Sequence, residues 1–197
     1  MAATESRRLI LASSSRYRGA LLQRLGLAFE GIAPDCDESA RHGESPRALA
    51  VRLAAAKARR VADANGDAIV IGSDQVAELD GIAIGKPGSH AQAVAQLQRC
   101  SGRIVDFHTA VCVIDGTRGS AHEFLDLTRV HFRALEGAEI ERYLQVEQPY
   151  DCAGSFKCEG LGSALFTAIE TRDPSGLIGL PLIALCERLR QCGVRIP

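Results

Sequence analysis

The chain lacks the features that would direct it to nucleic acid or to a membrane. Its formal net charge is −1, so we expect no overall electrostatic attraction to nucleic acid or to an anionic bilayer. No apolar run approaches the ~18–20 residues that a membrane-spanning helix needs. The N-terminal run Leu9–Ala12 is also too short for the apolar region of a signal peptide. These absences predict a protein with neither a nucleic-acid nor a membrane partner.

Tryptophan is absent, and aromatic residues make up only 5% of the chain, so its 46% hydrophobic fraction is mostly Ala, Leu, Val and Ile. That fraction is ample for a core, and nothing in the composition indicates disorder. The 197 residues suit a single domain, which we expect to span residues 1–197.

The cysteines do not form a pattern typical of a disulfide framework or a zinc site. Their number, seven, is odd, and the nearest pair, Cys152 and Cys158, has no histidine cluster beside it. Reduced, mostly buried thiols in a cytoplasmic protein are therefore expected.

Helices and strands alternate along the chain, which predicts a mixed α/β fold. Asp80-Gly81, between Leu79 and Ile82, is typical of a type I′ hairpin turn. The apolar runs predict strands over Leu9–Ala12, Phe29–Ala33, Ala68–Gly72, Arg103–Asp115, Glu123–Phe132 and Leu165–Ile169. Helical spacing and capping residues predict helices over Arg16–Leu25, Ser45–Asn65, Ser89–Cys100, Glu136–Gln148 and Leu182–Leu189.

Polar residues gather where the first strand runs into the first helix, in the segment LASSSRYR from Leu11 to Arg18. Free N–H groups and the dipole at a helix N-terminus favour an anion, and serine hydroxyls with Arg18 could hold phosphate oxygens. The alternative, a serine-rich capping loop with surface arginines, stays open. Arg7 and Arg8 add positive charge nearby, but a solvated tail is the simpler interpretation.

A second polar group, Ser73-Asp74-Gln75, follows the apolar run Ala68–Gly72. An aspartate at the end of a buried strand could hold a divalent metal or deprotonate water. It could equally cap the following turn, which is the commoner fate of such a residue. Gln75 has both a donor and an acceptor, which suits it to a base edge as well as to an ordinary turn.

Two lysines are placed where they could face an anion. Lys57 lies one turn beyond Leu53, at the border of the apolar stripe of its helix, and could reach inward. Lys86 is held between Gly85 and Pro87 in a tight turn, as a point charge for a phosphate would be. Neither position is specific by itself.

Two further segments have a composition that suits a ligand. The stretch from Tyr150 to Phe166 is rich in glycine and contains Glu159, which resembles a ligand-covering loop more than a packing element. Asp35, Asp37 and Glu38 form a carboxylate cluster that could bind a metal or simply be solvated.

Taken in order, these segments resemble the Maf family of nucleotide pyrophosphatases over nearly the whole chain, from Leu9 to Arg190. The resemblance depends on the ordered set LASSSRYR, DCDES, the Lys57 helix, IGSDQVA, GKP, SGR, AGSFKCEG and LIGLP. It implies a mixed sheet flanked by helices with a cleft between two lobes, as in Maf and inosine triphosphatase-like proteins. It also implies hydrolysis between the α and β phosphates with a divalent cation (Mg, Mn or Co), and a possible homodimer.

The chain departs from the common family pattern in ways that indicate a subfamily. Arg16 and Tyr17 stand where most members have Pro and Arg, and Ser73-Asp74-Gln75 replaces Ala-Asp-Thr. With Glu159, these residues resemble the members that act on 7-methyl-GTP rather than on dTTP or UTP. An aromatic ring at Tyr17 would attract the positively charged methylated base, and Glu159 would accept hydrogen bonds from its N–H groups.

The resemblance also implies roles for individual residues. Asp74 would be the proton acceptor that activates water, although it could instead be a metal ligand, and Asp37 would be the carboxylate associated with the metal. Tyr17, Gln75 and Glu159 would govern substrate choice. Phosphate-contacting or catalytic positions would be Ser13, Arg18, Lys57 and Lys86.

Three alternatives remain at this point. The same chemistry could act on UTP, dTTP or another modified nucleotide. The protein could be a nucleotide-binding regulator of cell division that does not rely on catalysis. A plain α/β domain, whose serines and glycines serve only turns, would require every motif to be coincidental.

Overall fold

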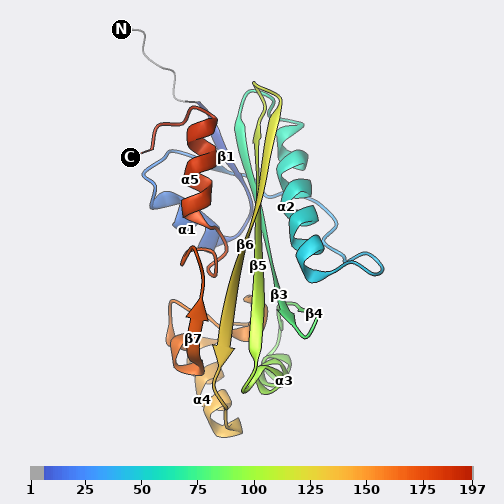
Figure 1. The fold of residues 1–197 in the computed structure, drawn as a ribbon, viewed down its shortest axis with the longest axis vertical. Helices are drawn as coiled ribbons and strands as arrows, with labels where there is room; N and C mark the ends of the chain where they lie inside the picture. The colour runs from blue at the N-terminus through green and yellow to red at the C-terminus, as the bar shows by residue number, and fades with distance from the viewer. Residues whose placement is uncertain (1–6, 197) are drawn as a thin grey trace.

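The computed structural model describes residues 7–196 and contains one mixed sheet with helices on both faces (Figure 1). The strand order is β2-β1-β3-β5-β6-β7, with β4 paired to β3. The strands are β1 (Leu9–Ala12), β2 (Glu30–Gly31), β3 (Ile69–Leu79), β4 (Ile82–Ile84), β5 (Ile104–Asp115), β6 (Ser120–Phe132) and β7 (Phe166–Glu170). The helices are α1 (Arg16–Gln23), α2 (Pro46–Ala62), α3 (His90–Cys100), α4 (Gly137–Glu147) and α5 (Leu182–Gln191), with 3₁₀ turns η1 (Ala153–Ser155) and η2 (Leu161–Leu165). The predicted mixed α/β fold is confirmed.

Three long antiparallel strands, β3, β5 and β6, run the length of the molecule and connect its two halves (Figure 1). β1 and β2 extend the sheet in parallel in one half, whereas β4 and β7 extend it in the other. The predicted turn at Asp80-Gly81 joins β3 to β4, and both residues have positive φ (52° and 80°), as a type I′ turn requires.

Helix α2 covers one face of the sheet and approaches it closely. Ser45 caps the helix and Pro46 occupies its first turn, as predicted. Gly72 of β3 makes the close approach possible, because a Cβ atom there would lie 2.3 Å from the carbonyl oxygen of Ala54. The glycine therefore sets the distance between β3 and α2.

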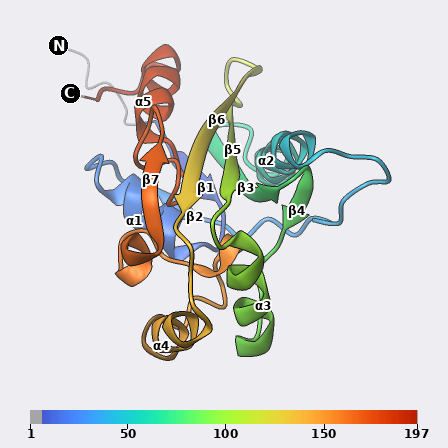
Figure 2. The same cartoon turned by 60° about the horizontal axis from the view of Figure 1, so that its bottom comes forward.

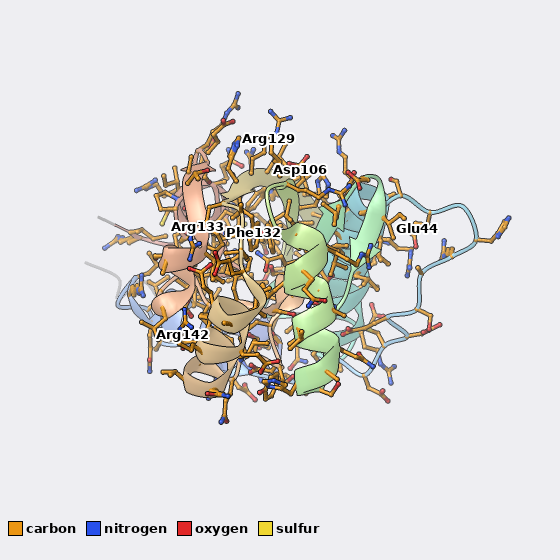
Figure 3. The ribbon with its side chains drawn as sticks, turned by 90° about the horizontal axis from the view of Figure 1, so that it is seen from below. Glu44, Asp106, Arg129, Phe132, Arg133 and Arg142 are labelled. Atoms are coloured by element: carbon orange, nitrogen blue, oxygen red, sulfur yellow. The ribbon has the colours of Figure 1, made fainter. Side chains whose placement is uncertain are left out.

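The opposite face is covered by different helices in the two halves. Around β1, the buried side chains of α1 and α5 pack on the sheet through Leu21, Leu22, Leu185 and Leu189. In the other half, α3 and α4 lie side by side (Figure 2). Phe132, labelled in Figure 3, belongs to an aromatic cluster beneath them that also contains Phe107, Phe156 and Phe166.

The N-terminal arginines do not form the expected solvated tail. The guanidinium of Arg7 contacts the fully buried carboxylate of Asp115 at 2.5 Å. Arg8 forms an ion pair with Glu30 at 2.7 Å and a hydrogen bond with Asn65. The prediction was wrong because the acidic partners lie 22 or more residues away in sequence, where local pattern does not reveal them.

The seven cysteines are all unpaired, as expected, although only Cys100, Cys112 and Cys192 are buried and the other four are partly exposed. Among residues 7–196, no helix combines the length and apolar character that a bilayer-crossing segment would need.

Candidate functional site

The site lies at a gap along one edge of β3. On this edge β1 pairs with β3 as far as Ala12 opposite Gly72, and β4 pairs from Ile84 opposite Ala77. Within the described part of the chain, the segment 73–76 between them has a partner strand only on the other edge, where β5 pairs continuously. Backbone and side chains of this segment can therefore face a ligand.

Asp74 consequently lies in the interior of β3, and the expectation that the strand ends before Ser73 is wrong. Pairing with β5 carries the strand on to Glu78, and pairing with β4 includes Leu79. What ends near Asp74 is the neighbouring strand β1, so the carboxylate still reaches open space. Alternation along the strand directs Asp74 toward α2, and Ser73 and Gln75 toward the face that carries α1 and α5.

A cavity of about 590 Å³ opens at this gap, a size typical of small-molecule sites. It receives residues from the loop before α1, from α2, from β3 and from the segment after β4. Seven of the nine residues to which the family resemblance gives a role line it: Ser13, Tyr17, Arg18, Lys57, Asp74, Gln75 and Lys86. The structure thus brings together groups separated by more than 70 residues in the sequence.

Lys57 is the centre of the charged part of the cavity. Its Nζ donates to Oδ1 of Asp74 at 2.6 Å and lies 2.7 Å from the carboxylate of Glu38. The side chains of Lys57 and Asp74 are 7% and 10% exposed, so the pair is nearly withdrawn from water, whereas Glu38 is exposed. Lys57 reaches inward from α2, as its place beside the apolar stripe allowed.

The pKa values of the two carboxylates are shifted in opposite directions. Burial raises the pKa of Asp74, and the charges of Lys57 and Arg18 offset this only in part. At Glu38 partial burial also raises the pKa, but the hydrogen bond from Lys57 and the charges of Lys57, Lys86 and Arg18 outweigh it, so the pKa is lowered. Such a divided pair suits a proton acceptor beside a carboxylate that is ionised more readily.

One side of the cavity is formed by the loop before α1 and the start of that helix. Ser15 caps the helix through the N–H of Arg18, and Ser13 accepts from the N–H of Ser15 at 3.1 Å. The Arg18 side chain is fixed by donating from Nε to the carbonyl of Gly179 at 3.0 Å and from Nη1 to Ser13 at 3.4 Å. Lys86, which is exposed, also lines the cavity.

A smaller cavity of about 120 Å³ adjoins the first and shares Tyr17, Arg18, Gln75 and Lys86 with it. Glu159 lines only this smaller cavity. The guanidinium of Arg16 lies over the Tyr17 ring, 4.8 Å from its centroid, so one face of that ring is already covered by a cation. Burial raises the pKa of Tyr17 to about 12, which keeps its hydroxyl protonated at neutral pH.

Asp37 does not line either cavity. Its carboxylate accepts from the N–H of Ser39 at 2.9 Å in the loop before α2, and that hydrogen bond lowers its pKa. Glu38, the next residue, makes the contact with Lys57. The acidic cluster recognised in the sequence therefore contributes to the cavity through a different member from the one expected.

Some contacts of the site could not be read from the sequence. Ser73, part of the recognised polar group, is buried and donates to the carbonyl of Gly179 at 3.0 Å. Thr109, in the middle of β5, gave no signal and contacts Gln75. Asp151 lines both cavities. The LIGLP segment from Leu177 to Pro181 was part of the recognised pattern. The backbone carbonyl of its Gly179 accepts hydrogen bonds from Arg18 and Ser73 and so holds both side chains at the site.

The described residues contain no group of three or more His, Cys, Asp or Glu side chains arranged to hold a metal ion by themselves. Asp74 and Glu38, however, both direct carboxylate oxygens at Lys57. Mg²⁺ is commonly bound by one or two carboxylates together with substrate phosphates. The donor set therefore fits a cation shared with a phosphorylated ligand.

Comparison with solved structures shows which known fold this chain resembles. It is similar to the structure of the Staphylococcus aureus Ham1 protein, with a TM-score of 0.53 over 93% of this chain and all of that one, at 16% identity. At that identity the likeness concerns the fold alone.

Sequence comparison then gives the family. The profile of the Maf-like proteins matches residues 8–192, so the chain belongs to the Maf-like protein family. A Xanthomonas axonopodis pv. citri protein named 7-methyl-GTP pyrophosphatase is 60% identical over 96% of this chain and 99% of its own length. Proteins of the same name from Burkholderia lata and Albidiferax ferrireducens are 57% and 55% identical, over 93% and 96% of this chain and 89% and 96% of their own lengths.

Proposed function

We propose that this protein hydrolyses a nucleoside triphosphate between its α and β phosphates, and that its substrate is 7-methyl-GTP. The observation that carries the proposal is the buried carboxylate of Asp74 in a cavity that also contains Arg18, Lys57 and Lys86. The names of relatives that share 55–60% of their residues with this chain supply the substrate.

The two adjoining cavities suggest how the substrate lies. The smaller one, beside Tyr17 and Glu159, would take the base, and the larger one, which holds the cations, would take the triphosphate. Gln75 belongs to both cavities and directly follows Asp74 along β3. The phosphorus nearest the nucleoside would therefore come closest to Asp74, which favours attack at the α phosphorus.

The cations would hold the phosphates and stabilise the leaving pyrophosphate. Arg18 is held in place by Ser13 and Gly179 and would contact phosphate oxygens with the donors that remain. Lys86, on the exposed side, would contribute a point charge. Because Arg18 is held in place before the substrate arrives, little reorganisation of this group would accompany the reaction.

Asp74 would accept the proton of the attacking water. Its raised pKa, which burial causes, makes it a stronger base than an exposed aspartate. Lys57 would hold the carboxylate in place through its 2.6 Å hydrogen bond. Asp74 and Glu38 would hold the divalent cation, Mg²⁺, Mn²⁺ or Co²⁺, which neutralises charge on the phosphates when bound.

Recognition of the methylated base would use the free face of Tyr17 and the carboxylate of Glu159. Since Arg16 covers one face of the ring, the base can stack only on the other. Glu159 is exposed at the smaller cavity and would accept hydrogen bonds from the base while offsetting its positive charge.

A panel of nucleoside triphosphates tests the proposal. The purified protein would be incubated with 7-methyl-GTP, GTP, UTP, dTTP and ATP under Mg²⁺, Mn²⁺ or Co²⁺, and released pyrophosphate would be measured. We expect the highest kcat/KM with 7-methyl-GTP. A preference for UTP or dTTP would refute the substrate while keeping the chemistry, whereas binding without turnover under all three metals would favour a nucleotide-binding regulator.

The family resemblance also leads us to propose a cytoplasmic homodimer. Sedimentation equilibrium would give twice the chain mass of 21.0 kDa for a dimer and the single chain mass for a monomer. Fractionation of cells that produce the protein at its natural level would test the compartment.

A further inference from the structure

Lys157 lies two residues before Glu159 in the glycine-rich segment, but it lines neither cavity. Its Nζ donates to the backbone carbonyl of Glu147, the last residue of α4, at 2.7 Å. The same ammonium group lies 3.5 Å from the carboxylate of Glu147, and the two side chains are 18% and 17% exposed. Glu147 lines neither cavity either, so this ion pair lies behind the residues that a ligand would touch.

The turn that carries Glu159 is built on the same pair. The backbone N–H of Leu161 donates to the carboxylate of Glu147 at 2.8 Å. The backbone N–H of Gly160 donates to the carbonyl of Lys157 at 3.3 Å. A Cβ atom at Gly160 would lie 2.5 Å from the carboxylate of Glu147, so the turn lies directly against that group. The pair and Glu159 are therefore held close to one another.

What a carboxylate adds at position 147 is charge. Lys157 alone would close the end of α4, because a helix C-terminus favours a cation and disfavours a carboxylate. An amide oxygen at position 147 would accept from the N–H of Leu161 as a carboxylate oxygen does. The negative charge of Glu147 is thus explained by its partner, the ammonium group of Lys157, and not by the helix or the turn.

One ammonium group and two carboxylates meet here, and among the described residues the ion pair of Lys157 is with Glu147 and not with Glu159. The carboxylate of Glu159 accepts instead from the thiol of Cys158 at 3.3 Å. Burial raises the pKa of that thiol to about 12, so it remains a neutral donor. The negative charge of Glu159 is therefore left for a ligand.

The charge of Lys157 nevertheless reaches the smaller cavity, which Cys152 lines. Burial raises the pKa of the Cys152 thiol to about 11, and the positive charge of Lys157 is among the influences that oppose the rise. The same charge would repel a cationic ligand in this cavity. The carboxylate of Glu147 cancels much of that repulsion, because an anion beside a cation weakens the cation's field at a distance.

We propose that Glu147 is a specificity-determining residue that acts from behind the smaller cavity. By balancing Lys157, it leaves the negative charge of Glu159 uncancelled, so the cavity prefers a positively charged base to a neutral base of the same shape. The inference rests on the proposed function, because it places the base in this cavity. 7-Methylguanine and guanine are the matched pair of bases, since they differ by the methyl group and the positive charge that it brings.

The test is a binding measurement at mildly acidic pH, where 7-methylguanine keeps its N1 proton. Calorimetry in the presence of Mg²⁺ would give the dissociation constants of the α,β-methylene analogues of 7-methyl-GTP and GTP, and their ratio is the readout. We expect Glu147→Gln, which removes only the charge, to reduce the preference for the methylated analogue about two- to fivefold. Lys157→Met should increase it by a similar factor. The double variant, in which the charges balance again, should return close to the wild-type ratio.

Glu139→Gln is the matched control. Glu139 lies at the other end of α4, pairs with Arg133 and lines neither cavity, so its loss should leave the ratio unchanged. A pair that served only the structure would weaken the binding of both analogues alike. Opposite shifts of the ratio in Glu147→Gln and Lys157→Met are therefore specific to the electrostatic role.

An unchanged ratio in Glu147→Gln, or shifts of the same sign in the two single variants, would overturn the inference. So would a wild-type protein that binds neither analogue or does not prefer the methylated one. If Glu147→Gln does not fold, as judged by circular dichroism, Lys157→Met decides the matter, and a ratio that is unchanged or reduced there overturns the inference. Failure of the proposed function is a separate result, because wild type would then bind the analogues without cleaving 7-methyl-GTP.

Discussion

The ammonium group of Lys57 lies 2.6 Å from the carboxylate of Asp74, and both side chains are almost completely buried. The pair comes from different elements, α2 and β3, which Gly72 allows to approach closely. Breaking a buried pair by removing one partner leaves an uncompensated charge, so this contact controls both the position and the pKa of the proposed base.

Replacing Asp74 by asparagine should abolish most of the activity without unfolding the protein. The amide keeps the shape of the carboxylate but cannot accept a proton, so we expect kcat to fall by ~10²–10⁴-fold. Pyrophosphate release gives the rate, and circular dichroism reports the fold. Glu78→Gln is a matched control on the same strand, because Glu78 contacts His108 outside the cavities. Near-normal rates in Asp74→Asn would remove Asp74 from the reaction.

Replacing Lys57 by methionine should move the acidic limb of the pH–rate profile to higher pH. Asp74 must be ionised to accept a proton, and Lys57 is the strongest influence that lowers its pKa. Without this charge the pKa of Asp74 should rise further, and log kcat/KM should begin to fall at a correspondingly higher pH. Lys86→Met is the control, since Lys86 is not among the groups that shift Asp74. Equal profiles for the two variants would contradict the account.

Glu38 and Asp37 should differ in their effect on the metal requirement. Glu38 faces Lys57 in the cavity, whereas Asp37 is hydrogen-bonded to Ser39 outside it. We expect Glu38→Gln to raise the Mg²⁺ concentration needed for half-maximal activity several-fold, because one ligand is lost. Asp37→Asn should change it little. If the order is reversed, the acidic loop must rearrange when substrate and metal bind.

Gly72→Ala should lower both stability and activity. The added Cβ would lie 2.3 Å from the backbone oxygen of Ala54 and 2.5 Å from the nitrogen of Ala58, and neither is the end of a flexible side chain. The strain should cost about 1–3 kcal/mol in the free energy of unfolding, measured in urea. Because α2 must move away from β3, Lys57 should also lose its contact with Asp74. A variant as stable and as active as wild type would show that the spacing is adjustable.

The elements of the fold that depend on local signals could be predicted from the sequence. Ser45-Pro46 marks the start of α2, and Asp80-Gly81 marks the turn between β3 and β4. The extension of β3 through Asp74 could not be predicted in this way, because it depends on pairing with β5, some 36 residues further along the chain. The same reason explains the partners of Arg7 and Arg8.

At the site, residue types were easier to predict than the atoms they present. The acidic cluster pointed to the right loop, but only the path of the backbone places Glu38 rather than Asp37 in the cavity. Thr109 gives no signal within a strand of mostly apolar residues. Its contacts with Gln75 and Gly176 form only when the loop that contains Gly176 folds against β5.

The central claim, that water attacks the α phosphorus, is tested most directly by the position of an oxygen label. The protein would be allowed to cleave 7-methyl-GTP in ¹⁸O-enriched water, and the products would be separated and weighed by mass spectrometry. Our account predicts one ¹⁸O atom in the nucleoside monophosphate and none in the pyrophosphate. Label in the pyrophosphate, or release of orthophosphate in its place, would contradict it.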